Sequence, residues 1–262
     1  MTEKLRAAIY PLITLAFIVL VWQLAINQFE IEDYILPEPL LVATSIIDGF
    51  REGDFMGHFL ATAEATVFGY IIGCGIAFLI GVAVAESPTF DKFVYPCIVA
   101  LQSMPKVALA PLILVWFGYE IESRIIMVGL ICFFPMFVNT VVGIRQTDPE
   151  LIDLCRAFSA SRHYVFFNAK LPSAATDIFA GLQIGVVLAL IGAVVAEFIA
   201  SERGLGYMIE SAAVSLTVSN MFAGVIILAM MGVIGTAVVR AIERRVVFWR
   251  GELAQINLEQ AS

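Results

Sequence analysis

Six long apolar runs set the strongest limit on how this chain folds. They lie at about residues 7–26, 64–85, 93–117, 124–144, 173–200 and 221–239. A helix of about 20 apolar residues crosses the hydrocarbon core of a bilayer. The hydrophobic fraction of 60% and the mean hydropathy of +0.92 exceed those of soluble domains. We therefore predict an all-α polytopic membrane protein with six spans, in which residues 1–262 form a single transmembrane domain.

The first run has two interpretations, a signal peptide and a retained span. A signal peptide has an apolar core of 7–15 residues, followed by a small-x-small cleavage site. The run at 7–26 is longer, and no such site follows it. We therefore expect a retained span.

Positive charges predict the orientation of the spans, because Lys and Arg gather in cytoplasmic loops. With six spans and both termini cytoplasmic, the cytoplasmic segments hold most of the 15 Lys and Arg residues: Lys4, Arg6, Lys92, Arg145, Arg156, Arg162, Lys170, Arg240, Arg244, Arg245 and Arg250. The outer segments hold Arg51, Arg124 and Arg203. The first outer segment, residues 28–63, has seven Asp or Glu residues against one Arg, and within it residues 39–50 have the apolar spacing of a short surface helix.

The third run contains groups that a continuous membrane helix does not tolerate. Pro105 and Pro111 each remove a backbone hydrogen bond, so we expect a broken or kinked helix there. An intramembrane charge is a functional hypothesis by default, and Lys106 is such a charge. The candidate residues of a translocation path are Gln102, Ser103, Met104, Lys106 and Asn139. The alternatives are that Lys106 makes a structural pair or faces an aqueous vestibule, and that the polar groups bond across helices.

Two runs carry small residues at intervals of four, which let helix backbones approach closely. These residues are Gly69, Gly73, Ala77, Gly81 and Ala85 in the second run, and Gly181, Gly185, Ala189 and Ala193 in the fifth. We expect both faces to pack against other helices.

The sequence argues against several classes of function. The net charge of −8 disfavours nucleic acid as a partner. Four cysteines without Cys-x-x-Cys spacing and two histidines suggest neither a disulfide framework nor a metal site. The chain has no Gly-Lys pair and hence no P-loop, so ATP chemistry belongs to another subunit.

Residues 148–172 form the long polar-flanked interruption in the second half of the chain. Thr147 or Asp148 can cap a helix that has Pro149 at its first position and Glu150 in its first turn. Ser159-Ala160-Ser161 then breaks the pattern. A second short helix, 162–170, leads to Leu171-Pro172, where the next span is expected to begin.

Residues 148–172, from here on called the coupling segment, resemble the cytoplasmic coupling loop of ATP-binding cassette importer permeases. That pattern reads Glu-Ala-Ala, three residues, Gly, about nine residues, then hydrophobic-x-Leu-Pro. Asp153-Leu154-Cys155 occupies its start, and Leu171-Pro172 matches its end. Ser159 stands where the family has a glycine that favours a tight turn with positive φ. A serine that keeps this backbone costs about 1 kcal/mol.

Further segments are similar to the nitrate/sulfonate/taurine branch of these permeases. They are Leu36-Pro37-Glu38-Pro39, residues 103–112 with Trp116-Phe117-Gly118, Phe133-Phe134-Pro135 with Asn139-Thr140, and residues 195–198 with 204–207. The resemblance implies a type I importer fold in a bacterial inner membrane, and no cofactor bound by this chain. It also implies two cytoplasmic ATPases that bind ATP and Mg²⁺, a second permease copy, identical or different, and an extracytoplasmic solute-binding protein.

The resemblance assigns roles to residues of this chain. The candidate ATPase-coupling residues are Glu150, Asp153, Arg156, Phe158, Ser159, Ser161, Tyr164 and Phe166. Asp153 and Arg156 are expected to orient the segment, and the aromatic side chains to supply docking area. The alternative is that these aromatics pack on the ends of this chain's own spans. Glu197 is expected to hold an outer gate.

Three other functions compete with an importer permease. A secondary transporter driven by an ion gradient usually has internal repeats and buried carboxylates, and no convincing repeat is present. An integral-membrane enzyme needs a cluster of catalytic side chains at a membrane face, and none is found. A non-catalytic scaffold is the third. The branch handles nitrate, bicarbonate, alkanesulfonates, taurine, aromatic acids and thiamine precursors, and we expect a small anion.

Overall fold

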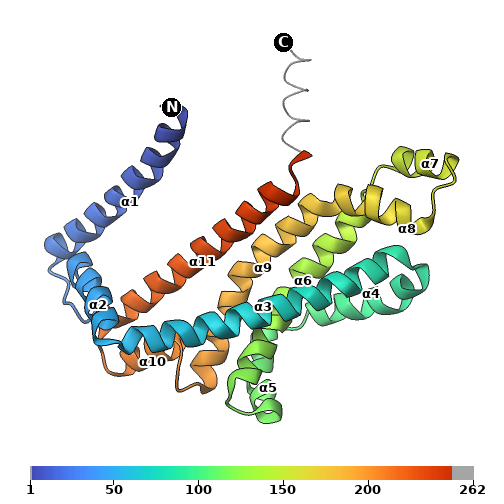
Figure 1. The fold of residues 1–262 in the computed structure, drawn as a ribbon. Coiled ribbons are helices and arrows are strands. Elements are labelled where there is room, and N and C mark those ends of the chain that lie inside the picture. Colours follow the sequence, from blue (N-terminus) through green and yellow to red (C-terminus); the bar gives the residue numbers. More distant parts are fainter. Residues whose placement is uncertain (1, 250–262) are drawn as a thin grey trace. The chain divides into compact units, whose positions relative to one another are not determined.

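The computed structural model describes residues 2–249, which contain helices and no strand (Figure 1). The elements are α1 (Thr2–Phe29), α2 (Pro39–Glu52), α3 (Asp54–Glu86), α4 (Pro88–Gln102), the 3-10 turn η1 (Lys106–Leu109), α5 (Ala110–Phe117), α6 (Ile121–Arg145), α7 (Pro149–Ala157), α8 (Arg162–Val165), the π-helical turn η2 (Phe166–Lys170), α9 (Leu171–Ala200), α10 (Leu205–Val214) and α11 (Val218–Val246). The predicted all-α class is confirmed. Arg250, counted above as a cytoplasmic charge, lies outside the described residues.

Among the described residues, four helices are long and apolar enough to cross a membrane, at 54–86, 121–145, 162–199 and 218–246. The pair α4 and η1–α5 makes a fifth if it is one broken span. The predicted first span lies within α1, whose described apolar part is Ile13–Phe29. The chain is therefore polytopic, and the count of six spans stays a prediction.

The described residues fall into two compact units. The first joins residues 2–61 and 202–229, and the second joins residues 62–201 and 230–249. The division lies within α3 and within α11, and each of these helices contributes to both units.

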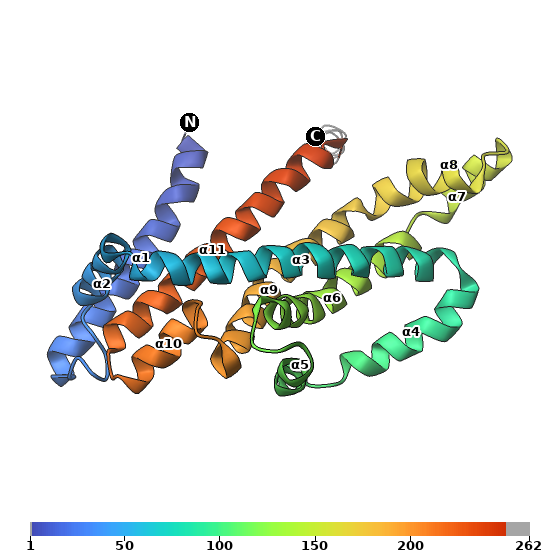
Figure 2. The same ribbon diagram turned by 60° about the horizontal axis from the view of Figure 1, so that its bottom comes forward.

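The second unit is built on the close packing of α3, α6 and α9. A Cβ atom at Gly73 would lie 2.6 Å from both the Cα and the carbonyl oxygen of Gly129, so the α3 and α6 backbones touch. On α9, a Cβ atom at Gly181 would lie 2.9 Å from the Cβ of Asn139. Both predicted small-residue faces thus pack against a neighbouring helix, as expected. Figure 2 shows α6 and α9 running beside each other.

The predicted break in the third run is confirmed. Helix α4 ends at Gln102, and the chain bends by 90° before it continues through η1 and α5. Pro105 has an extended backbone and precedes the first residue of η1, and Pro111 lies in the first turn of α5, where a missing N–H costs least. The two prolines therefore sit at helix starts, and the bend sets Lys106 at the break.

The end of the coupling segment agrees with the prediction in its bounds and differs in its continuity. Helical turns occupy 162–170 and α9 begins at Leu171, as expected, but no break separates them, and the helical run continues from Arg162 to Ile199. Pro172 has no N–H to donate to the carbonyl four residues earlier. The π-helical turn just before it changes the pairing, with the Leu171 N–H donating to the Phe166 carbonyl. The helix thus passes the proline without ending.

The first unit contains α1, α2, α10 and the first parts of α3 and α11. The rings of Trp22 and Phe222 lie 5.5 Å apart, and the Ser45 hydroxyl donates to the Asn220 side-chain oxygen over 2.6 Å. These two contacts tie α1 and α2 to the start of α11. The predicted short helix at 39–50 is present as α2.

Candidate functional site

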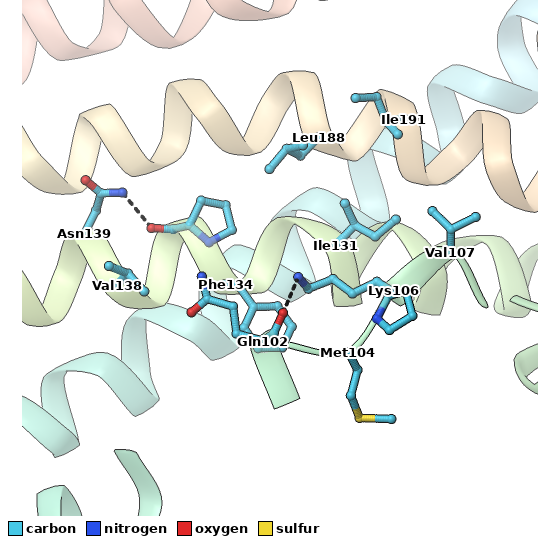
Figure 3. A pocket seen from close by; sticks show the side chains of 12 residues that line it. Gln102, Met104, Lys106, Val107, Ile131, Phe134, Val138, Asn139, Leu188 and Ile191 are labelled. Carbon is cyan, nitrogen blue, oxygen red and sulfur yellow. Dashed lines mark hydrogen bonds between the residues drawn. The ribbon is translucent and has the colours of Figure 1, made fainter. Parts of the chain in front are cut away.

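A cavity of about 510 Å³ lies in the second unit at the break between α4 and η1 (Figure 3). Its lining comes from the break itself, from α6 and from α9: Gln102, Met104, Pro105, Lys106, Val107, Ile131, Phe134, Pro135, Val138, Asn139, Leu188 and Ile191. Four of the five predicted path residues are among them. Ser103 is not, and its hydroxyl instead donates to the Val99 carbonyl over 3.4 Å.

Among the described residues that line the cavity, Lys106 is the only charged one. Its Nζ donates to the Gln102 carbonyl over 3.4 Å and stands 4.4 Å from the centroid of the Phe134 ring. An ammonium is attracted to the face of an aromatic ring. Within the described residues no carboxylate lies within 4 Å of Nζ. The contacts with Gln102 and Phe134 are a structural pairing of the kind considered as an alternative, without an ion pair.

The two amide residues of the cavity, Asn139 and Gln102, differ in the hydrogen bonds that they make. Asn139 Nδ2 donates to the Pro135 carbonyl over 2.8 Å within α6, while its oxygen has no described donor. Gln102 contributes its backbone carbonyl to Lys106. The remaining lining is mostly apolar, with Leu188 and Ile191 of α9 on the side opposite Gln102 and Met104 (Figure 3). The cavity therefore combines one cation, polar amides and an apolar wall.

Glu197 is fully buried near the end of α9 and does not line this cavity. Its carboxylate accepts a hydrogen bond from the Thr62 hydroxyl at 2.8 Å, and Arg124 Nη1 lies 4.0 Å away. The three side chains come from α9, α3 and the first turn of α6. A buried carboxylate needs such partners because transfer of a charge from water is costly.

The first half of the coupling segment begins as predicted. Asp148 caps α7, its side chain accepting from the Glu150 N–H at 2.9 Å, and Pro149 follows it. Asp153 and Arg156 form an ion pair of 3.2 Å within the helix, and both side chains are 71% exposed. An exposed pair of this spacing contributes a few tenths of a kcal/mol. It stabilises α7 locally, and neither side chain makes another ion pair within the described residues.

The aromatic residues of the coupling segment divide into two groups. Phe158 (81% exposed), Tyr164 and Phe167 leave their rings largely uncovered. Phe166 is half-buried and packs against the core formed by α3, α4, α6 and α9. The predicted docking area is thus available from Phe158 and Tyr164, while Phe166 contacts this chain's own spans.

Two ion pairs join the ends of the spans at the base of the coupling segment. Lys170 Nζ lies 2.6 Å from Glu86 at the end of α3, and Arg145 Nη2 lies 2.6 Å from Asp91 in α4. Together they connect α3, α4, α6 and the start of α9 around the segment. Of the two pairs, only the one with Lys170 joins the coupling segment itself to another helix.

Ser159 occupies the left-handed region with φ of 57°, the backbone that the family glycine favours. Replacement by glycine removes the contact of Cβ with the backbone and is expected to stabilise the turn by about 1 kcal/mol. Hydrogen exchange of the α7 amides should slow accordingly. Ser161→Gly is the matched control, because Ser161 has φ of −68° and caps α8 through the Tyr164 N–H. Loss of this cap should speed hydrogen exchange. Equal effects of Ser159→Gly and Ser161→Gly on exchange would contradict the argument.

Several residues around these sites had no signal in the sequence. Leu188 and Ile191 are ordinary apolar residues of a span, and Phe134 becomes notable only when Lys106 lies over it. Arg124 was predicted at the start of a span without a partner, and Thr62, in the outer segment 28–63, was not a candidate. A family alignment with paired changes at positions 62, 124 and 197 is the signal that would have linked them.

Comparison with known proteins gives one family. Residues 69–248 match the family described as binding-protein-dependent transport system inner membrane component. This range includes the cavity, Glu197 and the coupling segment.

Two relatives and one solved structure illustrate the similarity. A permease named for aliphatic sulfonate transport, SsuC of Bacillus subtilis, is 30% identical over 90% of this chain and 85% of its own length. The formylaminopyrimidine transport permease ThiX of Halalkalibacterium halodurans is 30% identical over 93% of this chain and 96% of its own length. A structure of the MetNI methionine ABC transporter in an inward-facing conformation aligns with a TM-score of 0.56 over 72% of this chain and 95% of that chain, at 17% identity. This last likeness concerns the fold.

Proposed function

Because the chain belongs to the family of binding-protein-dependent transport system inner membrane components, we propose that it forms the translocation path of an ATP-driven importer for a small organic anion. Permeases of this family work with a separate ATPase and with a solute-binding protein. The chain itself is a non-catalytic permease subunit of the inner membrane. ATP and Mg²⁺ bind to the partner ATPase.

The proposed assembly contains two copies of this permease and two ATPases. Both chain termini and the coupling segment face the cytoplasm, as the distribution of Lys and Arg suggests. Exposed Phe158 and Tyr164 dock on the ATPase, Asp153 and Arg156 orient α7, and the ion pairs of Lys170 and Arg145 pass the motion to the spans. Glu197 and its partners hold the outer gate.

The composition of the cavity supports the anion. Its one charged group is the Lys106 ammonium, no carboxylate lines it, and the rest of the wall is largely apolar. Such a lining suits a solute with one anionic group and a short carbon skeleton, as in an alkanesulfonate. The sulfonate relative agrees with this chemistry. A formylaminopyrimidine permease is equally similar in sequence, so the cavity rather than the relatives carries the proposal.

Uptake measurements test the proposed function. The permease, its ATPase and its binding protein are reconstituted in liposomes, and entry of labelled taurine and ethanesulfonate is followed. Uptake that requires internal ATP and the binding protein is expected. Uptake that persists without ATP and collapses with an ion gradient would instead establish secondary transport.

Lys106→Met is expected to lower sulfonate uptake about tenfold to a hundredfold, because one charge-assisted hydrogen bond to the solute is lost. Lys106→Arg keeps the charge and should retain most activity. Lys92→Met is the matched control, since Lys92 is an exposed lysine in α4 outside the cavity. Normal sulfonate uptake by Lys106→Met in a folded, ATP-hydrolysing complex would overturn the anion site.

A further inference from the structure

A second cavity, of about 270 Å³, lies in the first unit, and its lining shares no residue with that of the Lys106 cavity. We call it the outer pocket. Its walls come from the first turns of α3, from α10 and from the start of α11, and its polar side chains are Asp54, His58, Ser211, Ser215, Thr217 and Asn220. None of these residues was singled out by the sequence, and the proposed transport step does not use them.

The outer pocket lies on the side proposed to face outward. Asp54 precedes the predicted second span by about ten residues, or roughly 15 Å of helix. Helix α3 has 33 residues and is therefore about 50 Å long, more than the roughly 30 Å of the hydrocarbon core. Asp54, Ser211 and Ser215 are exposed. The pocket is therefore accessible from the aqueous phase.

The hydroxyl groups of the outer pocket are mainly acceptors. Ser215 Oγ donates to the Ser211 carbonyl over 2.8 Å, and Thr217 Oγ1 lies 3.0 Å from Ser215 Oγ and 3.4 Å from the Ala212 carbonyl. The protons of both hydroxyls thus have acceptors within the protein, while their oxygens keep free lone pairs. With the Asp54 carboxylate, these oxygens favour a ligand that donates hydrogen bonds and carries positive charge.

Hydrogen bonds and a ring contact hold other lining residues of the outer pocket in place. His58 Nδ1 accepts from the Gly204 N–H at 3.1 Å, and its ring lies 5.9 Å from that of Tyr207. The Asn220 oxygen accepts from Ser45. Among the described lining residues Asp54 alone carries a formal charge when His58 is neutral, and the Gly204 N–H orients that imidazole. Burial lowers the pKa of His58, on which Asp54 and the neighbouring Arg203 act in opposite directions.

We propose that the outer pocket receives a lysine or arginine side chain of the solute-binding protein during docking, an inference that rests on the proposed function. The volume is below the 300–1,000 Å³ typical of small-molecule sites and suits one long side chain. The outer segment 28–63, to which Asp54 belongs, has seven acidic residues against one arginine, which favours a basic partner surface. The pocket fixes the position of that surface over the permease.

Binding to the complete importer in nanodiscs tests this inference. The probe is the binding protein recovered with the tagged importer from its native cells and identified by mass spectrometry. Asp54→Asn is expected to weaken its affinity about thirtyfold or more, the effect of removing one partner of an enclosed charge pair. Asp48→Asn, an equal charge change on exposed α2, should weaken it less than about threefold through long-range attraction.

Two further arms identify the occupant. Methylguanidinium chloride should compete with the binding protein on the wild-type importer and not on Asp54→Asn, whereas tetramethylammonium chloride, which donates no hydrogen bond, should not compete. Ser211→Phe fills the pocket and should block docking, while Ala213→Phe, exposed on the same helix, should not.

The outcomes separate this inference from the proposed function. If the wild-type importer binds no such protein, the proposed function fails and this inference with it. If the wild-type importer binds this protein and Asp54→Asn weakens the affinity no more than Asp48→Asn does, the inference alone is overturned. If Asp54→Asn instead alters only the retention of phosphatidylethanolamine in the nanodiscs, the occupant is a lipid amine and the inference is also overturned.

Discussion

Gly73→Val is expected to prevent assembly of a stable second unit. A Cβ atom at this position would lie 2.6 Å from the Cα and the carbonyl oxygen of Gly129, and 2.9 Å from Cys132 Sγ. Two of these atoms belong to the α6 backbone and cannot rotate away, so α3 and α6 must separate. Overpacking of this kind costs about 3 kcal/mol or more when it moves a backbone, and separated membrane helices lose the close contact that holds them together.

Thermal unfolding of the detergent-solubilised chain, followed by size-exclusion chromatography, measures this effect. Gly75→Val is the matched control: it lies two residues along the same helix, and a Cβ atom there meets nothing within 4 Å. It should elute and unfold like the wild type, whereas Gly73→Val should aggregate or unfold at a markedly lower temperature. Equal stability of the two valine variants would show that α3 and α6 do not touch at Gly73.

The same contact shows what sequence can predict in this fold. Hydropathy and helix length predict the apolar helices, because each must satisfy its backbone hydrogen bonds internally. Small residues at intervals of four predict which face of α3 and α9 is buried. Pro105 and Pro111 predict the break, because proline removes local hydrogen bonds. All these signals are local to one helix.

Features that depend on two helices were not predictable in the same way. Thr62 and Glu197 are 135 residues apart in sequence, and only tertiary packing brings the Thr62 hydroxyl to 2.8 Å from the Glu197 carboxylate. Phe166 was expected to face a partner, but the π-helical turn rotates the residues around it and places it against the core. The sequence predicted most of the polar residues of the cavity around Lys106, but it did not predict the apolar wall from α9.

Glu197→Leu is expected to lower the free energy of unfolding by about 3–5 kcal/mol, as for removal of one partner of a buried ion pair. The change leaves Arg124, whose side chain is 12% exposed, without the carboxylate 4.0 Å away. Arg124 Nε and Nη1 have no hydrogen-bond partner among the described residues, so little else compensates that charge. Thr62 also loses its acceptor at Glu197. Glu197→Gln keeps an acceptor and should cost less.

The double variant Arg124→Met with Glu197→Leu should recover at least half of the stability lost in Glu197→Leu, because it buries no charge. Glu64→Leu removes an exposed carboxylate from α3 and should have little effect. If Glu197→Leu lowers the free energy of unfolding no more than Glu64→Leu does, the ion pair is not a structural element.

Uptake by the folded double variant then separates structural support from gating. If Glu197 only supports the junction of α3, α6 and α9, the double variant should import solute at nearly the wild-type rate. If the pair holds the outer gate, the gate loses the interaction that distinguishes its closed state. The double variant should then hydrolyse ATP without importing solute, or hydrolyse it without the binding protein. Stability measures the pair in one state, whereas coupling between hydrolysis and uptake measures the difference between two states.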